Sequence, residues 1–263
     1  MKLHFVQIDA FADRPFGGNP AAVMPLTEWL PDDVLQAIAI ENNLSETAFT
    51  VPTAGDADYE LRWFTPAVEV ALCGHATLAS GHHLIEGRER IRFRTRKAGV
   101  LEVRRAGENG YALDLPATPM FAAPRPEIAA ALGVPDAPTW TSSTEAVEET
   151  VIVVLEDEAA VRGLQPDFRA LGSHHVMAVP TAPGTETDVV SRVFVPSFGI
   201  DEDPVTGSAH AALAHFWAAR LGRPSFSAFQ ASARGGRMDC TLEGDRAILV
   251  GRCVTVIEGN FLL

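Results

Sequence analysis

The sequence lacks a basic cluster and has an excess of acidic residues. Its 263 residues include 21 Lys and Arg against 34 Asp and Glu, which gives a formal net charge of −13. The densest basic stretch, residues 88–96, alternates with Glu89, Ile91 and Phe93, as one solvated face of a strand does. Because the phosphates of nucleic acid repel such a surface, the sequence argues against a nucleic-acid partner.

Long apolar runs are also missing. No stretch approaches the ~20 apolar residues that span a membrane, and residues 1–4 do not begin the apolar stretch of a signal peptide. We therefore predict a cytoplasmic protein that does not contact a membrane. At 263 residues and 47% hydrophobic content, the chain suffices for one large domain or for two of about 130 residues.

Cysteine is scarce, and the common catalytic sequences are absent. Cys73, Cys240 and Cys253 are odd in number and widely spaced, which favours neither a disulfide framework nor a zinc cluster. His210 and His215 are five residues apart and do not share a helix face, so we predict no metal site. No Walker sequence and no nucleophile elbow occurs, so phosphoryl transfer and serine hydrolysis have no support.

One stretch, residues 42–49 with the sequence NNLSETAF, places a lone carboxylate between a helix and a strand. A helix is predicted from residue 31 to Asn42 or Asn43, because Asn tolerates a left-handed C-terminal turn. Residues 47–51 predict a strand that Pro52 stops. Glu46 would then lie on a loop between rigid elements, a common position for a catalytic group. An ordinary surface glutamate is the alternative.

The two halves of the sequence repeat one plan. Phe64, Gly74 and Phe93 match Phe194, Gly207 and Phe229, and each matched pair lies in a similar local sequence. Three ordered matches with a slowly drifting offset indicate two similar lobes. Many short strands and about two good helices per half predict α+β lobes in which each sheet wraps a helix.

Prolines between Pro116 and Pro126 predict the connection between the lobes. Residues 1–117 would form an N-terminal lobe that carries Glu46 and the Cys-Gly-His turn. Residues 118–263 would form a C-terminal lobe that carries the DEDPVTGS turn, and its last strand can pack back on the first lobe.

Each half places a turn of small residues directly before its best helix. These turns are residues 73–75, with the sequence CGH, and residues 206–208, with the sequence TGS. A helix N-terminus offers free N–H donors and a partial positive charge, so it binds carboxylates. If a pseudo-twofold axis relates the halves, both turns converge on one cleft. The alternative is that Gly and Ser are simply good cap residues.

Three adjacent carboxylates, Asp201, Glu202 and Asp203, precede the second turn. Because burying them together is costly, at least two should face water. Pro204 holds Asp203 extended, and we place Asp203 in the cleft. There it would bind a substrate amine or hydroxyl, or hold an imidazole in one tautomer.

With NNLSETAF, FTPAVEVALCGHATLA and GIDEDPVTGSAH in this order, the chain resembles the PhzF-like isomerase family of phenazine biosynthesis. That family shares the two-lobed fold of diaminopimelate epimerase, and the resemblance covers essentially the whole chain. It implies an α+β fold of two pseudo-symmetric lobes, each a mainly antiparallel sheet wrapped around a central helix. It also implies a homodimer that uses no cofactor.

The resemblance also assigns roles to individual residues. It implies that Glu46 is the catalytic acid/base and that His75 and Asp203 assist it. The positions implied for substrate binding are Ser45, Gly74, Gly207 and Ser208.

The reaction implied is an isomerisation that moves a proton between carbons of a small cyclic or unsaturated carboxylic acid. One desolvated carboxyl group can make both transfers. Epimerases and racemases of this fold use two facing cysteines, whereas Thr206 stands here at the counterpart of Cys73 and cannot act as a thiolate. Two-thiol racemisation is therefore not expected. An amino-acid epimerase or racemase on the same fold and a non-catalytic small-molecule-binding relative remain alternatives.

Overall fold

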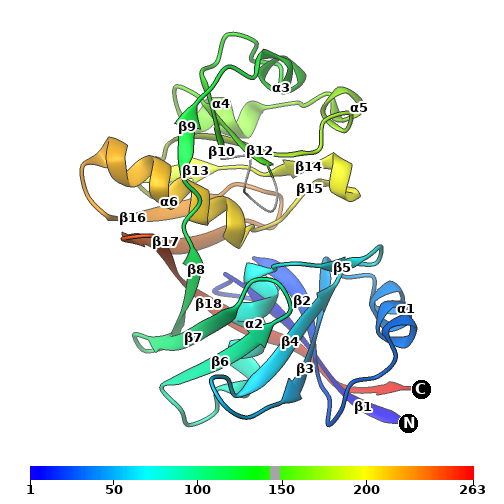
Figure 1. Ribbon diagram of the computed structural model, residues 1–263. Helices are drawn as coiled ribbons and strands as arrows, with labels where there is room; N and C mark the ends of the chain where they lie inside the picture. Colours follow the sequence, from blue (N-terminus) through cyan, green and yellow to red (C-terminus); the bar gives the residue numbers. More distant parts are fainter. Residues whose placement is uncertain (143–148) are drawn as a thin grey trace. The chain divides into compact units, whose positions relative to one another are not determined.

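The computed structural model describes residues 1–142 and 149–263, which divide into two compact units (Figure 1). Unit 1 comprises Met1–Asp114 and Val250–Leu263, and unit 2 comprises Leu115–Leu249. The chain passes from one unit to the other within β8, Gly110–Pro116, and within β18, Arg246–Leu262. The division into lobes of residues 1–117 and 118–263 stays a prediction. Within the described ranges, no helix has the length and apolar character needed to cross a membrane.

Unit 1 contains two long helices among short strands. Besides β8 and β18, its elements are β1 (Lys2–Ala10), β2 (Asn19–Pro25), α1 (Asp32–Asn42), β3 (Glu46–Pro52), β4 (Tyr59–Phe64), β5 (Glu69–Val70), α2 (Gly74–Leu84), β6 (Arg90–Thr95) and β7 (Val100–Ala106).

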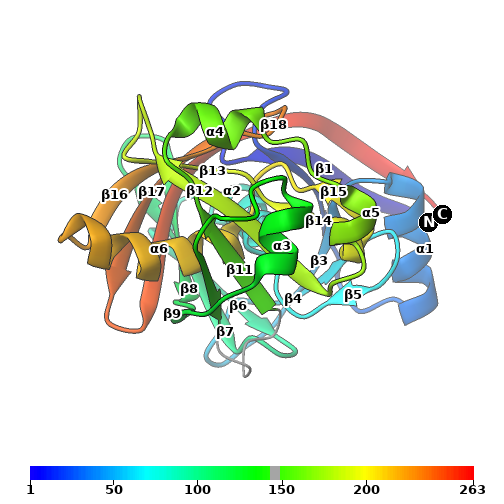
Figure 2. The ribbon, with the colours of Figure 1, turned by 90° about the horizontal axis from the view of Figure 1, so that it is seen from above.

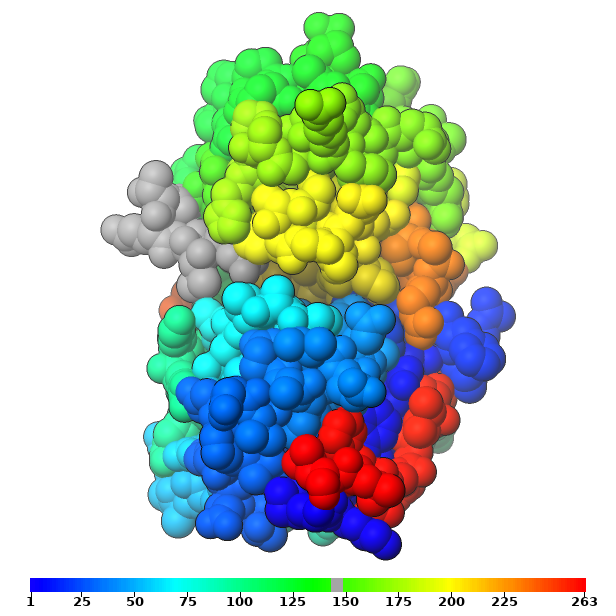
Figure 3. Space-filling view, turned by 90° about the vertical axis from the view of Figure 1, so that its right-hand side faces the viewer, coloured from blue at the N-terminus to red at the C-terminus, as the bar shows by residue number. Residues whose placement is uncertain are grey.

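The strands of unit 1 form a sheet that closes on itself. They pair in the order β18, β1, β2, β3, β4, β6, β7, β8, and β8 pairs in turn with β18. Figure 3 shows the first and last residues of the chain side by side, where β1 and β18 pair. The pairs β2–β3 and β4–β6 are parallel, and α1 and α2 provide the crossover connections that parallel pairs require.

Helix α2 is the central helix of unit 1 and contacts β1, β2, β3 and β7. Nine of its eleven residues are buried. Its two buried hydroxyl groups bond within the helix, since Thr77 donates to the carbonyl of Cys73 at 2.6 Å and Ser80 to that of Ala76 at 2.7 Å. The sequence therefore builds a helix that a sheet can surround on several sides.

Helix α1 begins and ends where the sequence predicts. Pro31 precedes it, two aspartates form its acidic first turn, and Asn43 ends it in the left-handed region at φ 49°. One face of α1 packs on a core cluster of unit 1. The buried members of this cluster are Leu3, Met24, Leu26, Leu35, Ile38, Ala39, Phe49, Val51 and Phe64.

Unit 2 repeats the plan of unit 1. Besides parts of β8 and β18, its elements are β9 (Met120–Ala122), α3 (Pro126–Ala131), β10 (Thr139–Ser142), β11 (Glu149–Val154), α4 (Glu158–Gly163), α5 (Phe168–Leu171), β12 (Val176–Pro183), β13 (Val189–Ser191), β14 (Phe194–Val195), a 3-10 turn (Pro196–Phe198), β15 (Ile200–Glu202), α6 (Gly207–Leu221), β16 (Ser225–Gln230) and β17 (Gly236–Glu243).

The strand pairing confirms the internal repeat. In unit 1 the series β1–β2, β2–β3, β3–β4, β4–β6 and β6–β7 alternates between antiparallel and parallel pairs. In unit 2 the series β10–β11, β11–β12, β12–β13, β13–β16 and β16–β17 alternates in the same way. Helix α6, the counterpart of α2, packs along β16 and β17 (Figure 2) and has ten buried residues out of fifteen. The predicted α+β fold of two similar lobes is therefore confirmed.

The segment from Pro116 to Pro126 differs from a simple linker. It contains β9, which pairs with β10 through Met120, Phe121 and Ala122. In the sequence, prolines at both ends of a short strand look like a linker. The strand between them has only three paired residues, too few to show an alternating apolar pattern.

Gly18 is the last residue of the connection between β1 and β2. Its φ is +61°, and a Cβ atom built there would lie 2.1 Å from the carbonyl oxygen of Ala10. We expect Gly18→Ala to lower the free energy of unfolding by about 2–5 kcal/mol, because it adds backbone strain to a clash with backbone. Gly87→Ala is the control, since Gly87 has an ordinary φ and no atom within 4 Å of such a Cβ. Urea unfolding of both variants tests this, and equal stabilities would contradict it.

Candidate active site

Glu46 is the first residue of β3, so the prediction that it lies on a loop was wrong. Two contacts, one at Glu46 and one at the next residue, fix this end of the strand. It pairs with Ala21 in the parallel β2–β3 ladder, and the next residue, Thr47, accepts a hydrogen bond from the side chain of Asn42 at 3.1 Å. A strand end fixes the Glu46 backbone more tightly than a loop would.

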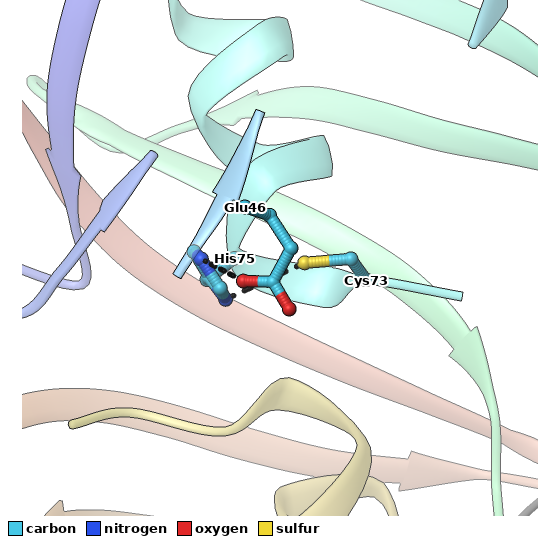
Figure 4. A group of neighbouring side chains, drawn as sticks. All are labelled: Glu46, Cys73 and His75. Atoms are coloured by element: carbon cyan, nitrogen blue, oxygen red, sulfur yellow. Dashed lines mark hydrogen bonds and ion pairs between the residues drawn. The ribbon is translucent and has the colours of Figure 1, made fainter. Parts of the chain in front are cut away.

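The carboxylate of Glu46 faces the imidazole of His75, the second residue of α2 (Figure 4). Oε2 of Glu46 lies 3.1 Å from Nε2 of His75, and their side chains are only 17% and 5% exposed. These two atoms do not meet the geometry of a hydrogen bond, so the contact between Glu46 and His75 is a close ion pair. The start of β3 and the start of α2 therefore bring together two of the residues predicted to be catalytic.

The opposite nitrogen of the imidazole has two further neighbours. Nδ1 of His75 lies 3.2 Å from Nδ2 of Asn19 and 3.5 Å from Sγ of Cys73. Asn19 is fully buried and begins β2. Asn19 was not among the residues predicted from the sequence, because its contact with His75 joins positions 56 residues apart.

The charges at this site follow from burial and from the short distances. Burial lowers the pKa of His75, but Cys73 and Glu46 beside it raise that pKa to a final value well above the ordinary one. Burial, and then the charge of Glu46, raise the pKa of the Cys73 thiol to about 11. A thiol with a pKa of about 11 stays protonated at neutral pH, and the raised pKa of His75 favours its protonated form beside Glu46.

Donor atoms of Glu46, Cys73 and His75 lie within 4.8 Å of one another, a spacing that a metal ion can bridge. The ring geometry does not favour such a site. The thiol approaches Nδ1 and the carboxylate approaches Nε2, so the two groups lie nearest to different nitrogens of the ring. A thiol that stays protonated is also a poor ligand. The arrangement suits proton chemistry better than metal binding.

The N-terminus of α2 completes the site in unit 1. Gly74 is the first residue of α2 and is buried, and the cap residue Cys73 makes no side-chain capping bond. Ser45, directly before Glu46, is half-buried. The first N–H groups of α2 thus stand next to the Glu46–His75 pair without a side chain to cap them, as an anion site requires.

The remaining predicted residues lie in unit 2. The backbone N–H of Asp203 donates to the carbonyl of Val193 at 3.0 Å, and its Oδ2 accepts a hydrogen bond from Oγ1 of Thr206. Gly207 and the half-buried Ser208 are the first two residues of α6. The convergence of both turns on one cleft stays a prediction.

The three adjacent carboxylates differ in exposure. Asp201 is exposed, but Glu202 accepts two hydrogen bonds from the guanidinium of Arg192, at 2.8 and 2.9 Å, and its side chain is 20% exposed. None of the three is fully buried, since Glu202 and Asp203 are both half-buried. A bidentate arginine 10 residues away compensates the burial of Glu202, and sequence spacing gives no sign of it.

His210 is fully buried in α6 and has a structural role. Its Nδ1 lies 2.8 Å from the carbonyl oxygen of Thr206, to which it donates as a neutral ring. Burial lowers the pKa of His210 to about 4, so the ring is uncharged at neutral pH. This histidine ties the start of α6 together and is not suited to carry a proton.

Comparison with known proteins places these features in a family. Residues 8–259 match the model of the PhzC-PhzF family, phenazine biosynthesis-like proteins. An uncharacterized isomerase of Pseudomonas aeruginosa is 48% identical over 269 residues, covering 100% of both chains. A crystal structure of a PhzF-family phenazine biosynthesis protein from Enterococcus faecalis has a TM-score of 0.89 at 41% identity, again covering 100% of both chains.

More distant structures share the fold alone. A hydroxyproline epimerase from Agrobacterium vitis superimposes with a TM-score of 0.61 at 12% identity, over 98% of this chain and 92% of the epimerase. The family match and the close relatives extend over nearly the whole chain. This chain therefore belongs to the phenazine biosynthesis-like, or PhzF, family, and it is an isomerase.

Proposed function

We propose that the protein is a cofactor-independent isomerase that moves a proton between two carbons of a small cyclic or unsaturated carboxylic acid. Glu46 is the general acid and base, and His75 is its catalytic partner. The observation that carries this proposal is the buried ion pair itself, with 3.1 Å between Oε2 of Glu46 and Nε2 of His75. Buried, paired groups that include a shifted pKa, as that of His75 is, concentrate at functional sites.

In the proposed reaction, the Glu46 carboxylate takes a proton from a carbon of the substrate. The electron pair left behind spreads through the adjacent double bond toward the substrate carboxylate. The free N–H groups at the start of α2, from Gly74 onward, would bind that carboxylate and stabilise the charge that develops on it. Glu46, now protonated, returns the same proton to another carbon, so the double bond moves and no atom is gained or lost.

The two halves of the repeat differ in a way that supports one base rather than two. Glu46 begins β3, whereas its counterpart at the start of β12 is Val176, which is buried and cannot accept a proton. Cys73 precedes α2, whereas Thr206 precedes α6. Inversion at one carbon by two facing bases needs a base in each half, while a shuttle by one carboxyl group does not.

We further propose that Asp203, Gly207 and Ser208 act on the same substrate, with Ser45 and Gly74 among its binding residues. Family resemblance supports these assignments, together with the uncapped start of α6, since Thr206 makes no side-chain capping bond. Asp203 would bind an amine or hydroxyl of the substrate. The same resemblance leads us to propose a homodimer, and the composition and charge of the sequence lead us to propose a cytoplasmic protein without a nucleic-acid partner.

Two other functions are alternatives. The shared fold with a hydroxyproline epimerase favours an amino-acid epimerase or racemase as the second candidate. A pocket that binds a small acid without turnover is the third. Thr206, which stands where a second thiol would be needed, argues against the two-thiol form of the second.

A screen in D₂O tests the proposal. Cyclic and open-chain unsaturated amino and hydroxy acids are incubated with the protein and followed by ¹H NMR. We expect one acid to convert to an isomer with a shifted double bond. Deuterium at the α-carbon of an amino acid, with loss of optical purity and no bond shift, would establish an epimerase instead. Binding without conversion of any acid would favour the non-catalytic alternative.

A further inference from the structure

Gln230, the last residue of β16, holds the turn that carries Asp203. Its side chain is fully buried. Its Oε1 accepts a hydrogen bond from the backbone N–H of Thr206 at 2.8 Å, and its Nε2 donates to the backbone carbonyl of Asp203 at 2.7 Å. Because one end of the amide faces a donor and the other faces an acceptor, the orientation of the amide group is fixed.

This fixed amide also sets the direction of a hydroxyl group. Nε2 of Gln230 lies 3.3 Å from Oγ1 of Thr206, and the same Oγ1 donates to Oδ2 of Asp203. An amide nitrogen can only donate, so the Thr206 oxygen accepts there and its proton points to the carboxylate. The three groups form a chain of hydrogen bonds that runs from amide to hydroxyl to carboxylate.

The surrounding contacts make the turn rigid. Oγ of Ser232 donates to the carbonyl of Pro204 at 2.7 Å, and Nδ1 of His210 donates to the carbonyl of Thr206 at 2.8 Å. The backbone on both sides of Asp203 is therefore tied to β16, to the segment after it and to α6. Such anchoring is typical of groups that must be held within a fraction of an ångström.

Unit 1 has a similar arrangement at the equivalent place. Cys73 stands one residue before α2, as Thr206 stands one residue before α6. Sγ of Cys73 lies 3.5 Å from Nδ1 of His75, so in each unit the residue before the central helix contacts a side chain that we propose to be catalytic.

We propose that Thr206 and Gln230 are positioning residues that aim the Asp203 carboxylate, with Thr206 bonding the carboxylate and Gln230 orienting the Thr206 hydroxyl. This inference rests on the proposed function, because it gives the orientation of Asp203 a catalytic consequence. Neither residue needs to touch the substrate.

Crystal structures of two variants test the positioning without a substrate. Thr206→Val keeps the shape of the side chain and the backbone bond to Gln230 but removes the hydroxyl, and Thr206→Ser restores the hydroxyl. We expect the Asp203 carboxylate to leave its position in Thr206→Val and to keep it in Thr206→Ser. An unmoved carboxylate in Thr206→Val would overturn the inference.

Kinetics with the acid converted in the D₂O screen provide the second test. We expect Thr206→Val to lower kcat about 10–100-fold, Thr206→Ser to stay within about 3-fold of wild type, and thermal unfolding of both to change little.

In an Asp203→Asn background, Thr206→Val should cause no further loss, because it acts through Asp203. Additive losses would overturn the inference. Full activity of Asp203→Asn alone would overturn it as well and would also remove Asp203 from the proposed mechanism, while leaving the role of Glu46 untouched.

Discussion

Replacing Glu46 with glutamine abolishes turnover and leaves the fold and ligand binding near those of the wild type. Glutamine has almost the same shape, so it still fills the space beside His75, 3.1 Å from the imidazole in the wild type. It cannot accept a proton from carbon or return one, and we expect kcat to fall by at least about 10²–10⁴-fold, the typical contribution of a general acid or base. ¹H NMR of the conversion and calorimetric binding of the same acid measure the two quantities separately.

A matched control separates catalysis from the loss of one negative charge. Glu41→Gln makes the same chemical change at an exposed position of α1 and should leave kcat unchanged. Thermal unfolding of both variants checks the fold. Retention of more than a few per cent of activity in Glu46→Gln would remove Glu46 from the central role.

Replacing His75 with glutamine should cause the next largest loss and should change the pH profile. Glutamine keeps a polar group beside Glu46, but it carries no charge and no transferable proton. We expect kcat to fall by about 10²–10³-fold. In the wild type, activity should decline as pH rises through the raised pKa of His75, because the imidazole then loses the proton that makes it the cationic partner of Glu46. That alkaline limb should be absent from the variant.

The stability of the protein should show the same titration. The folded-state pKa of His75 lies above the ordinary value of 6.5, so the folded protein holds this proton more tightly than the unfolded chain does. The stabilisation is therefore complete below about pH 6.5 and is lost as pH rises through the folded-state pKa. Urea unfolding across this range should show a steeper decline for the wild type than for His75→Gln. His175→Gln, a change at an exposed histidine of unit 2, is the control. Identical slopes for wild type and His75→Gln would contradict the ion pair.

Local rules predicted the elements that frame the site. The end of α1 followed from the tolerance of Asn43 for a left-handed conformation. The repeat followed from matched residues such as Gly74 and Gly207, which begin the central helices of the two units. These signals succeed because each depends on the conformation of a few consecutive residues.

The sequence could not reveal the residues that orient the site from a distance. Asn19 lies 56 residues before His75 in the chain, and Gln230 lies 24 residues after Thr206. Both are buried amides whose partners are chosen by strand pairing and helix packing, and neither belongs to a local pattern. The bidentate bond of Arg192 to Glu202 escaped prediction for the same reason.

The most direct measurement is a crystal structure of the Glu46→Gln protein soaked with the acid that the wild type converts. We expect the acid's carboxylate to lie on the N–H groups at the start of α2, with a reacting carbon about 3–3.5 Å from the side chain at position 46. An acid bound with its reacting carbons out of reach of that side chain would contradict the claim that this one carboxyl group moves the proton.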